Sequence, residues 1–201
     1  MTHRDINNCL VLLVGVIACF ILLAPFLPQL DYIMGGAHRV PVPAFVGTAT
    51  AQGDDDPSTD NTNLQGDNQL YIPKIGVLAP ILDGKDSQTV DKGLWRRPLS
   101  STPGQQSNTV IVGHRFTYNH SIVQPFYHLD KLEAGDKIYI LWNGQKHVYT
   151  VSDKKIVKNT QVSVEAPTKN EQLTLYTCTP IWNPVDRLVI TALPDSGASN
   201  E

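Results

Sequence analysis

The sequence has little charge and no excess of basic residues. Only 17% of its 201 residues are charged, and the formal net charge at pH 7 is −3. Nucleic-acid binding needs a basic surface that neutralises phosphates, and no cluster of lysine and arginine supplies one. Nucleic acid is therefore excluded as a partner. With 41% hydrophobic residues, a chain of this length can bury one core and leaves little for a second domain of ordinary size.

Cysteine is also scarce, and the three cysteines divide by position. Cys9 and Cys19 lie in the first apolar run, whereas Cys178 stands alone near the other end. The chain beyond the apolar run therefore holds one thiol and cannot form an internal disulfide. A lone cysteine in an exported domain is either buried and inert or kept for its reactivity. Cys178 by itself leaves both readings open.

One long hydrophobic stretch lies at the N-terminus. Residues 9–24 carry no charge, and the apolar character continues to Leu30. A bilayer is crossed by about 20 mostly apolar residues, so we expect a single transmembrane anchor at 9–30 after a short cytoplasmic tail at 1–8. A buried core helix is one alternative. A cleaved signal peptide is another, but its candidate site, Ala49-Thr50-Ala51, lies about twenty residues past the apolar run.

The stretch after the apolar run is polar and poor in aromatic residues. Residues 31–68 consist mainly of Gly, Ala, Pro, Asp, Thr, Asn and Gln, and such a composition cannot bury enough apolar area to offset its ordering entropy. We expect a flexible extracellular stalk here. Asp54 to Asp56 lack the alternating ligands and the glycine of a calcium loop. The folded domain is then expected at 69–194, followed by a polar tail at 195–201.

Beyond the stalk, short apolar runs alternate with turn residues. They have strand lengths and are rich in Val, Ile, Tyr and Thr. The predicted strands are residues 70–72, 77–82, 109–112, 137–142, 147–151, 173–176 and 187–193. Asn143-Gly144 favours a type I′ turn and predicts a hairpin over Ile138 to Val151. Short helices are expected at Ser87 to Lys92 and at Gln124 to Leu132. The pattern predicts a mainly-β barrel or sandwich.

Three side chains could supply chemistry. Cys178 ends an alternating strand just before Pro180, at an edge where site residues are often presented. A free thiol has a pKa near 8.5, so catalysis would need a base or a cation beside it. His114 follows a strand and a glycine that permits close approach or an unusual backbone angle. Arg187 opens the last strand, where a hairpin-like return would bring it back to the thiol, and a guanidinium suits a developing oxyanion.

The other histidines of the expected domain have less specific interpretations. His120 falls in a loop and His128 in a predicted helix, where solvation or packing is the simpler role. His147 begins the second strand of the hairpin and is expected to face solvent. Arg187 could equally be a strand-edge residue that is solvated or paired with Asp186, since surface charges usually contribute little.

Several motifs, in order along the chain, resemble those of the sortase family. Ile72 to Val77, reading Ile-Pro-Lys-Ile-Gly-Val, resembles the opening strands of sortases. Val112 to Arg115 resembles their histidine motif, and Thr174 to Cys178 matches their Thr-Leu-x-Thr-Cys signature. Arg187-Leu188-Val189 completes the set, and the segment from Phe126 to Ile140 is also similar. Any one motif is weak, but together they cover nearly the whole expected domain.

The resemblance implies a closed eight-stranded β-barrel with one or two short helices and a Cys-His-Arg site. Cys178 would attack the carbonyl of a sorting-signal peptide and form a thioacyl enzyme. His114 would protonate the leaving amine and later take a proton from the incoming amine. Arg187 would stabilise the oxyanion, together with backbone N–H groups near Thr177 and Cys178.

The resemblance also implies the substrates and the location. The signal would be a Leu-Pro-x-Thr-Gly-like motif on a surface protein or pilin, and the acceptor an amine of a cell-wall precursor or a pilin lysine. No metal or other cofactor is implied, and the calcium activation found in some relatives cannot be read from these residues. The protein is expected in a bacterial cell membrane. Its catalytic domain is expected outside because a very short N-terminal tail and one span precede the rest of the chain.

The subclass and three rival functions stay open. Pilus-assembling sortases commonly carry an Asp-Pro-aromatic lid motif and often a second span, whereas Asp56-Pro57 is followed here by Ser58 and the chain ends in a polar tail. Another Cys/His transpeptidase family has a Ser-x-Gly pattern before its cysteine that this chain lacks. A cysteine peptidase would hydrolyse the same signal, and a non-catalytic surface module would simply bury Cys178.

Overall fold

The computed structural model describes residues 3–23, 68–119 and 121–195, and the chain divides into one unit at residues 1–38 and another at 39–201. Helix α1 (His3–Leu23) belongs to the first unit, and its large apolar side chains from Leu10 to Leu23 are exposed. No helix in the described part of the chain is long and apolar enough to cross a membrane. The structure therefore gives the predicted anchor no support. Residues 24–30 and the predicted stalk lie outside the described residues, except for Asn68.

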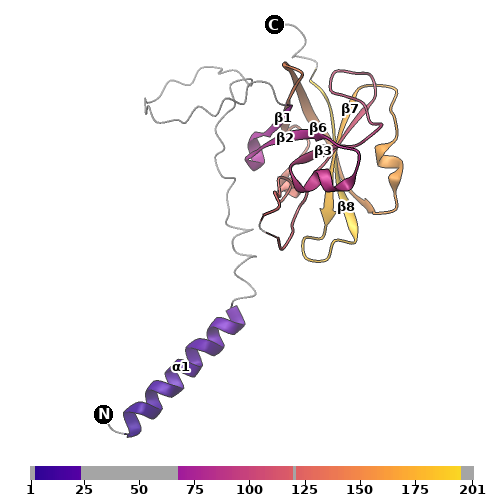
Figure 1. Ribbon diagram of the computed structural model, residues 1–201. Coiled ribbons are helices and arrows are strands. Elements are labelled where there is room, and N and C mark those ends of the chain that lie inside the picture. Colours follow the sequence, from indigo (N-terminus) through magenta and orange to yellow (C-terminus); the bar gives the residue numbers. More distant parts are fainter. Residues whose placement is uncertain (1–2, 24–67, 120, 196–201) are drawn as a thin grey trace, which may run out of the picture. The chain divides into compact units, whose positions relative to one another are not determined.

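Eight strands of the second unit close into a barrel, as the resemblance implied (Figure 1). Around the barrel the order is β1-β2-β3-β4-β7-β8-β6-β5. The strands are β1 (Gln69–Ile72), β2 (Val77–Asp83), β3 (Leu94–Arg96), β4 (Asn108–Val112), β5 (Lys137–Trp142), β6 (Gln145–Lys158), β7 (Gln172–Thr179) and β8 (Asp186–Pro194). Neighbouring strands are parallel at β2/β3 and β4/β7 and antiparallel elsewhere.

The hairpin predicted from Asn143-Gly144 is confirmed. Trp142 pairs with Gln145 across the turn, and both turn residues have positive φ, 50° and 77°. That combination is the one a type I′ turn requires and the reason for the Asn-Gly preference. The second strand, β6, runs well beyond the prediction to Lys158, with a register shift between Val151 and Asp153.

The short helices are 3₁₀ turns rather than α-helices. They are η3 (Pro73–Ile75), η4 (Ser87–Asp91), η5 (Leu129–Lys131) and η6 (Val162–Glu165). The helix predicted at Ser87 to Lys92 is η4, but the one predicted at Gln124 to Leu132 is wrong over most of its length. That segment forms successive i→i+3 turns and buries Phe126 and Leu129 completely. Tertiary packing of these apolar side chains overrides the helical pattern.

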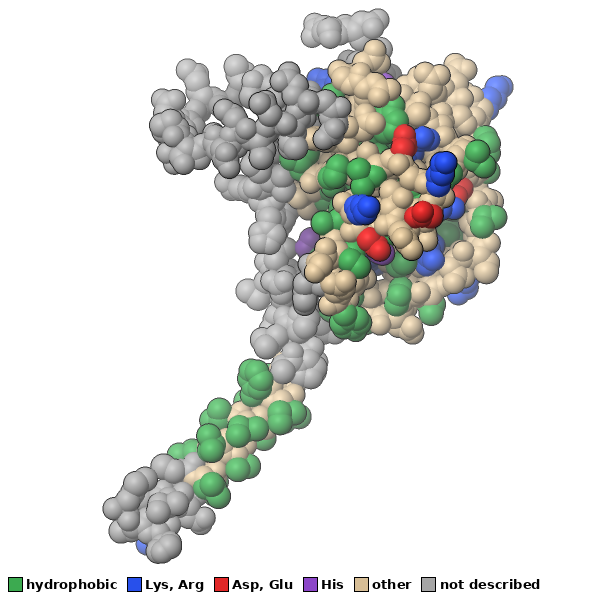
Figure 2. All heavy atoms as spheres, viewed as in Figure 1, with side chains coloured by type: hydrophobic (Ala, Val, Ile, Leu, Met, Phe, Trp, Pro, Cys, Tyr) green, Lys and Arg blue, Asp and Glu red, His purple; other side chains and the backbone are tan. Residues whose placement is uncertain are grey.

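Alternation along β7 decides which side chains face outward. Leu173 and Leu175 belong to the buried core inside the barrel. Because successive side chains of a strand point to opposite faces, Tyr176 and Cys178 lie on the outer face, and both are partly exposed. The outer surface carries interspersed acidic and basic side chains on the face shown in Figure 2, with no gathering of one sign.

Candidate functional site

The ends of three adjacent strands bring the predicted site residues to one region of the barrel. In the antiparallel pair of β7 and β8, Cys178 lies directly opposite Arg187. In the parallel pair of β4 and β7, Val112 lies beside Tyr176. The chain stays beside β7 for one more residue, because the Gly113 N–H donates to the Tyr176 carbonyl at 3.4 Å. His114 comes next, so all three candidate side chains stem from neighbouring backbone.

The thiol is half-buried and makes no disulfide. Within residues 3–23, 68–119 and 121–195, Cys178 Sγ has no hydrogen-bond partner, so the thiol and the imidazole of His114 are not hydrogen-bonded to each other. Hydrogen bonds of catalytic groups often lengthen without substrate and tighten when it binds. Arg187 Nη1 donates to the Asp186 carbonyl at 3.1 Å, which uses one of the five N–H groups of the guanidinium.

Gly113 and Thr177 fix the backbone beside the thiol. Thr177 is buried, and its Oγ1 donates to the Gly113 carbonyl at 2.7 Å. A Cβ on Gly113 would lie 2.8 Å from side-chain atoms of Leu94 and of Phe126. Gly113 therefore lets the backbone pack closely against Leu94 and Phe126. Close approach was one of the two explanations that the sequence offered for this glycine.

A buried arginine that the sequence analysis left without a role lies next to His114. Arg115 Nη1 donates to Thr179 Oγ1 at 2.8 Å, and its Nη2 lies 3.0 Å from Asp130 Oδ1. The Arg115 side chain is 7% exposed and that of Asp130 is 29% exposed. These contacts join the segment after β4 to the residue that follows Cys178. Only the Gly-His-Arg motif could have pointed to Arg115, and nothing in the sequence pointed to Asp130.

His114 has a carboxylate partner that the sequence analysis missed. His114 Nε2 lies 2.7 Å from Oδ1 of Asp91, the last residue of η4. The two residues are 23 positions apart and belong to different elements. No local pattern connects them, so only the folded barrel could identify this pair.

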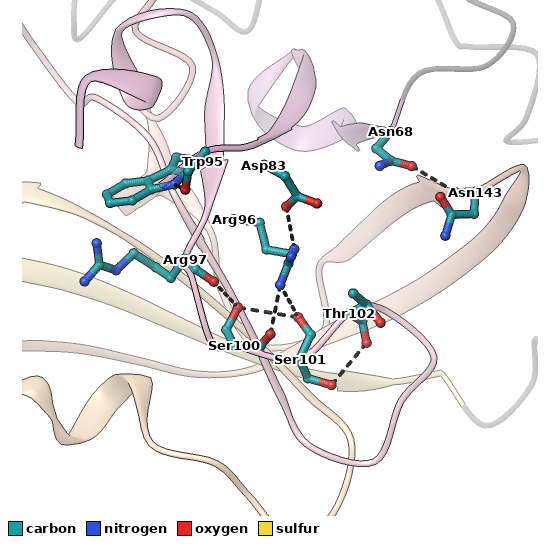
Figure 3. Close-up of polar contacts among 10 residues, drawn as sticks. Asn68, Asp83, Trp95, Arg96, Arg97, Ser100, Ser101, Thr102 and Asn143 are labelled. Atoms are coloured by element: carbon teal, nitrogen blue, oxygen red, sulfur yellow. Dashed lines mark hydrogen bonds and ion pairs between the residues drawn. The ribbon is translucent and has the colours of Figure 1, made fainter. Parts of the chain in front are cut away.

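A polar network lies on the outer face of the barrel around Tyr176, which precedes Cys178 by two residues on β7. Tyr176 Oη donates to Glu165 Oε1 at 2.5 Å, and Arg97 Nε lies 3.0 Å from both oxygens of the same carboxylate. Burial, followed by the hydrogen bond to Glu165, raises the pKa of Tyr176. The guanidinium of Arg97 lies 4.4 Å from the ring centroid of Trp95, and Figure 3 shows the two side chains next to each other.

Further contacts hold the connections around this network. Asn108 Nδ2 donates to the carbonyls of Val164 and Ala166 at 3.0 and 3.1 Å, which ties the connection between β6 and β7 to β4. Arg96 donates to Asp83 Oδ1 at 2.7 Å and to the Ser100 carbonyl at 2.8 Å (Figure 3). The loops that border the outer face are therefore fixed by side-chain hydrogen bonds.

An aromatic cluster links the two segments that follow His114 and Cys178. The ring centroid of Phe116 lies 4.6 Å from the ring centroid of Trp182 and 4.9 Å from that of Tyr118. Both are edge-to-face contacts, the arrangement that aromatic pairs prefer. Trp182 and Tyr118 are also exposed, so the cluster presents aromatic surface beside the candidate site.

The other histidines are not part of this arrangement. His120 lies outside the described residues, and the ring of His128 packs against Tyr127 at 4.8 Å. His147 does not face solvent as predicted. It is half-buried against Gly104, where an added Cβ would lie 2.6 Å from its ring, and burial lowers its pKa. Among the described residues no group of three His, Cys, Asp or Glu side chains could hold a metal ion.

The fold and the site define a closed β-barrel protein with an outward-facing thiol, an imidazole and a guanidinium on adjacent strands. The Sortase domain family model matches residues 70–195, well over half of the chain. The chain belongs to the sortase family.

Two curated relatives illustrate the similarity. Sortase D of Bacillus subtilis (strain 168) is 31% identical over 117 residues, which are 58% of this chain and 56% of the relative. Sortase SrtE1 of Streptomyces coelicolor is 28% identical over 142 residues, 63% of this chain and 39% of the relative. The chain thus spans about half the length of the curated relatives it matches, or less.

Solved structures agree on the fold. Sortase A from Corynebacterium diphtheriae, in its lid mutant, is 30% identical with a TM-score of 0.59, covering 69% of this chain and 79% of that one. Streptococcus agalactiae Sortase C1 is 26% identical with a TM-score of 0.60, covering 67% and 69%. Relatives of several sortase classes are similar to a comparable degree, so the similarity does not select one class.

Proposed function

We propose that the protein is a cysteine transpeptidase that cleaves a Leu-Pro-x-Thr-Gly-like sorting signal and joins the cleaved protein to an amine. The observation that carries the proposal is the pairing of Cys178 with Arg187 on the outer face of a sortase-family barrel, with His114 on the adjoining strand end. A half-buried thiol at a strand end, beside a cation and an imidazole, has the surroundings that a nucleophilic cysteine needs.

The reaction proceeds in two transfers. Cys178 Sγ, as the thiolate, bonds to the carbonyl carbon of the signal peptide, and the peptide C–N bond breaks. Protonated His114 gives its proton to the leaving amine. The second amine then attacks the thioester, gives a proton to His114, and Cys178 leaves as the thiolate. One amide bond replaces another, so no net oxidation and no energy source is required.

Arg187 stabilises the negative charge that develops on the carbonyl oxygen. The guanidinium is permanently charged, and only one of its N–H groups is used by the Asp186 carbonyl. The remaining donors can turn to the oxyanion, together with backbone N–H groups near Thr177 and Cys178. Donors aimed at charge that appears only in the transition state lower the barrier more than they strengthen substrate binding.

The donor would be a surface protein or pilin, and the acceptor an amine of a cell-wall precursor or a pilin lysine. Membership of the sortase family supports this substrate class. One similar solved structure is described as Sortase C1 of a GBS pilus island, which keeps pilin among the candidate donors. We further propose that the barrel acts at the bacterial cell surface and that residues 9–30 attach it to the membrane. The attachment rests on the apolar sequence alone.

A peptide-exchange assay tests the proposal. The purified full-length chain is incubated with a panel of sorting-signal peptides and with triglycine or a lysine-containing peptide as the amine. Mass spectrometry then separates the exchanged product from the hydrolysed one. Exchange by wild type and none by Cys178→Ala is the expected result. Hydrolysis that added amine never diverts would favour a peptidase, and no cleavage across a broad panel would overturn both enzyme assignments.

A further inference from the structure

The Asp91–His114 contact joins two elements that are each held firmly. In η4, the side chain of Asp86 caps the start by accepting from the Gln88 N–H at 3.0 Å, and the Lys92 N–H donates to the Thr89 carbonyl at 3.2 Å. The strand that follows, β3, pairs with β4 through Trp95 and Val112. Asp91 thus ends a capped turn just before one strand, and His114 lies just past the end of its neighbour.

His114 is held from its other side as well. Its backbone carbonyl accepts from the Phe126 N–H at 3.1 Å, and Phe126 is completely buried. The backbone of His114 is therefore fixed, and the side-chain contact with Asp91 at 2.7 Å sets the direction of the ring. Across the described residues, His114 has no other side-chain hydrogen bond.

The chemistry of the contact determines which nitrogen carries a proton. An ionised carboxylate only accepts hydrogen bonds, so we assign Nε2 of His114 as the donor in this contact. In a neutral imidazole one nitrogen is protonated and the other has a lone pair, so Nδ1 then has the lone pair. Within the described part of the chain, Nδ1 has no hydrogen-bond partner. It is the ring nitrogen that can exchange a proton with an amine.

We propose that Asp91 is a positioning residue for His114: it holds Nε2–H and makes Nδ1 the atom through which protons move. The proposal rests on the proposed transpeptidase function. When the peptide C–N bond breaks, Nδ1–H protonates the leaving amine, and when the second amine attacks the thioester, Nδ1 receives its proton. Asp91 touches neither substrate nor thiol and acts only through the imidazole.

The alternative is a surface ion pair without consequence. The Asp91 side chain is 47% exposed and that of His114 is 27% exposed, so water screens the attraction and the pair contributes little to folding. That exposure makes the proposal testable, because Asp91 can be replaced without unfolding the barrel. A positioning role lowers turnover, whereas an inconsequential surface pair leaves turnover unchanged.

The test compares Asp91→Ala and Asp91→Asn with Asp86→Ala in the full-length chain, by steady-state peptide exchange. Asp86→Ala removes the cap of the same 3₁₀ turn but leaves the carboxylate at His114, so it is the matched control. A misdirected catalytic group costs up to about 100-fold in rate, and we expect Asp91→Ala to lower kcat by about 10- to 100-fold with little change in KM. Asp91→Asn keeps an acceptor oxygen and should fall between Asp91→Ala and wild type. Asp86→Ala should stay close to wild type, because the bond from the Lys92 N–H to the Thr89 carbonyl and the pairing of β3 with β4 still hold Asp91.

Nitrogen NMR of imidazole-labelled protein provides a second readout that needs no substrate. Wild type should show the neutral His114 ring protonated at Nε2, and Asp91→Ala should show a mixture of both tautomers. Three outcomes would each overturn the proposal. They are a kcat of Asp91→Ala equal to that of wild type, equal losses of kcat in Asp91→Ala and Asp86→Ala, and a neutral His114 ring protonated at Nδ1 in wild type. If wild type exchanges no peptide, the transpeptidase function is refuted, and the tautomer measurement alone decides whether Asp91 positions the ring.

Discussion

Replacing Asp130 by Asn should destabilise the barrel strongly, because it removes the carboxylate charge that lies 3.0 Å from the buried guanidinium of Arg115. Arg115 is 7% exposed, so water cannot take the place of the carboxylate. Removing one partner of a buried ion pair costs about 3–5 kcal/mol. The carboxylate is itself 29% exposed, so the pair is not fully desolvated, and we expect the lower end, about 3 kcal/mol, for Asp130→Asn.

Thr179→Val provides the matched comparison at the other end of the same guanidinium. It removes one hydrogen bond of 2.8 Å to Arg115 but leaves the ion pair in place. A hydrogen bond to a charged group contributes about 1.5–3 kcal/mol, and valine has nearly the shape of threonine, so the loss should be about 1.5 kcal/mol. Asp130→Asn should therefore be the more destabilising of the two.

Urea unfolding followed by tryptophan fluorescence measures both variants. Two of the three tryptophans, Trp95 and Trp142, are buried side chains of barrel strands and report its unfolding. The midpoint should fall with little change in slope, since the same surface is exposed on unfolding. A loss below about 1 kcal/mol for Asp130→Asn would refute the assignment of Arg115 as a buried charge that depends on its partner.

Three further predictions concern the site and its surroundings. Arg187→Ala should cut kcat about 100-fold or more while the unfolding midpoint stays near wild type, because an oxyanion donor acts in the transition state; unchanged kinetics would remove Arg187 from the site. Gly113→Ala should destabilise by about 1–3 kcal/mol, since its Cβ would lie 2.8 Å from Leu94 and Phe126, and wild-type stability would show that the core yields there. Burial lowers the pKa of His147, so folding favours its neutral form, and the free energy of unfolding should fall as pH drops below about 6.5. His147→Gln should make the stability less dependent on pH over this range. A pH profile of stability that is the same in His147→Gln and wild type would contradict this prediction.

Local sequence patterns predicted much of the barrel. The Asn143-Gly144 turn could be identified because both residues tolerate positive φ, and the runs of alternating apolar residues identified seven of the eight strands. The missing strand, Leu94–Arg96, is three residues long and too short for any alternation to be visible. The second half of β6 was missed because its outward side chains are mostly charged, and it is a strand only through its pairing with β8.

The candidate site was predictable only where short segments connect its members. Cys178 and Arg187 lie on consecutive strands, so the hairpin-like return between them could be inferred from spacing. The roles of Asp91 and Asp130 as partners of His114 and Arg115 could not be inferred from the sequence. Each pair joins two elements that are distant in sequence or connected by irregular chain. Side-chain partners of this kind depend on tertiary structure and leave no periodic signal.

The peptide-exchange reaction of wild type beside Cys178→Ala tests the central claim most directly. With a sorting-signal peptide and an amine, wild type should release the C-terminal part of the signal and form the exchanged product, and a thioester adduct on Cys178 should be trapped when the amine is left out. Cys178→Ala should form neither product nor adduct. The same product from both proteins, or wild-type exchange with no adduct on Cys178, would contradict the account.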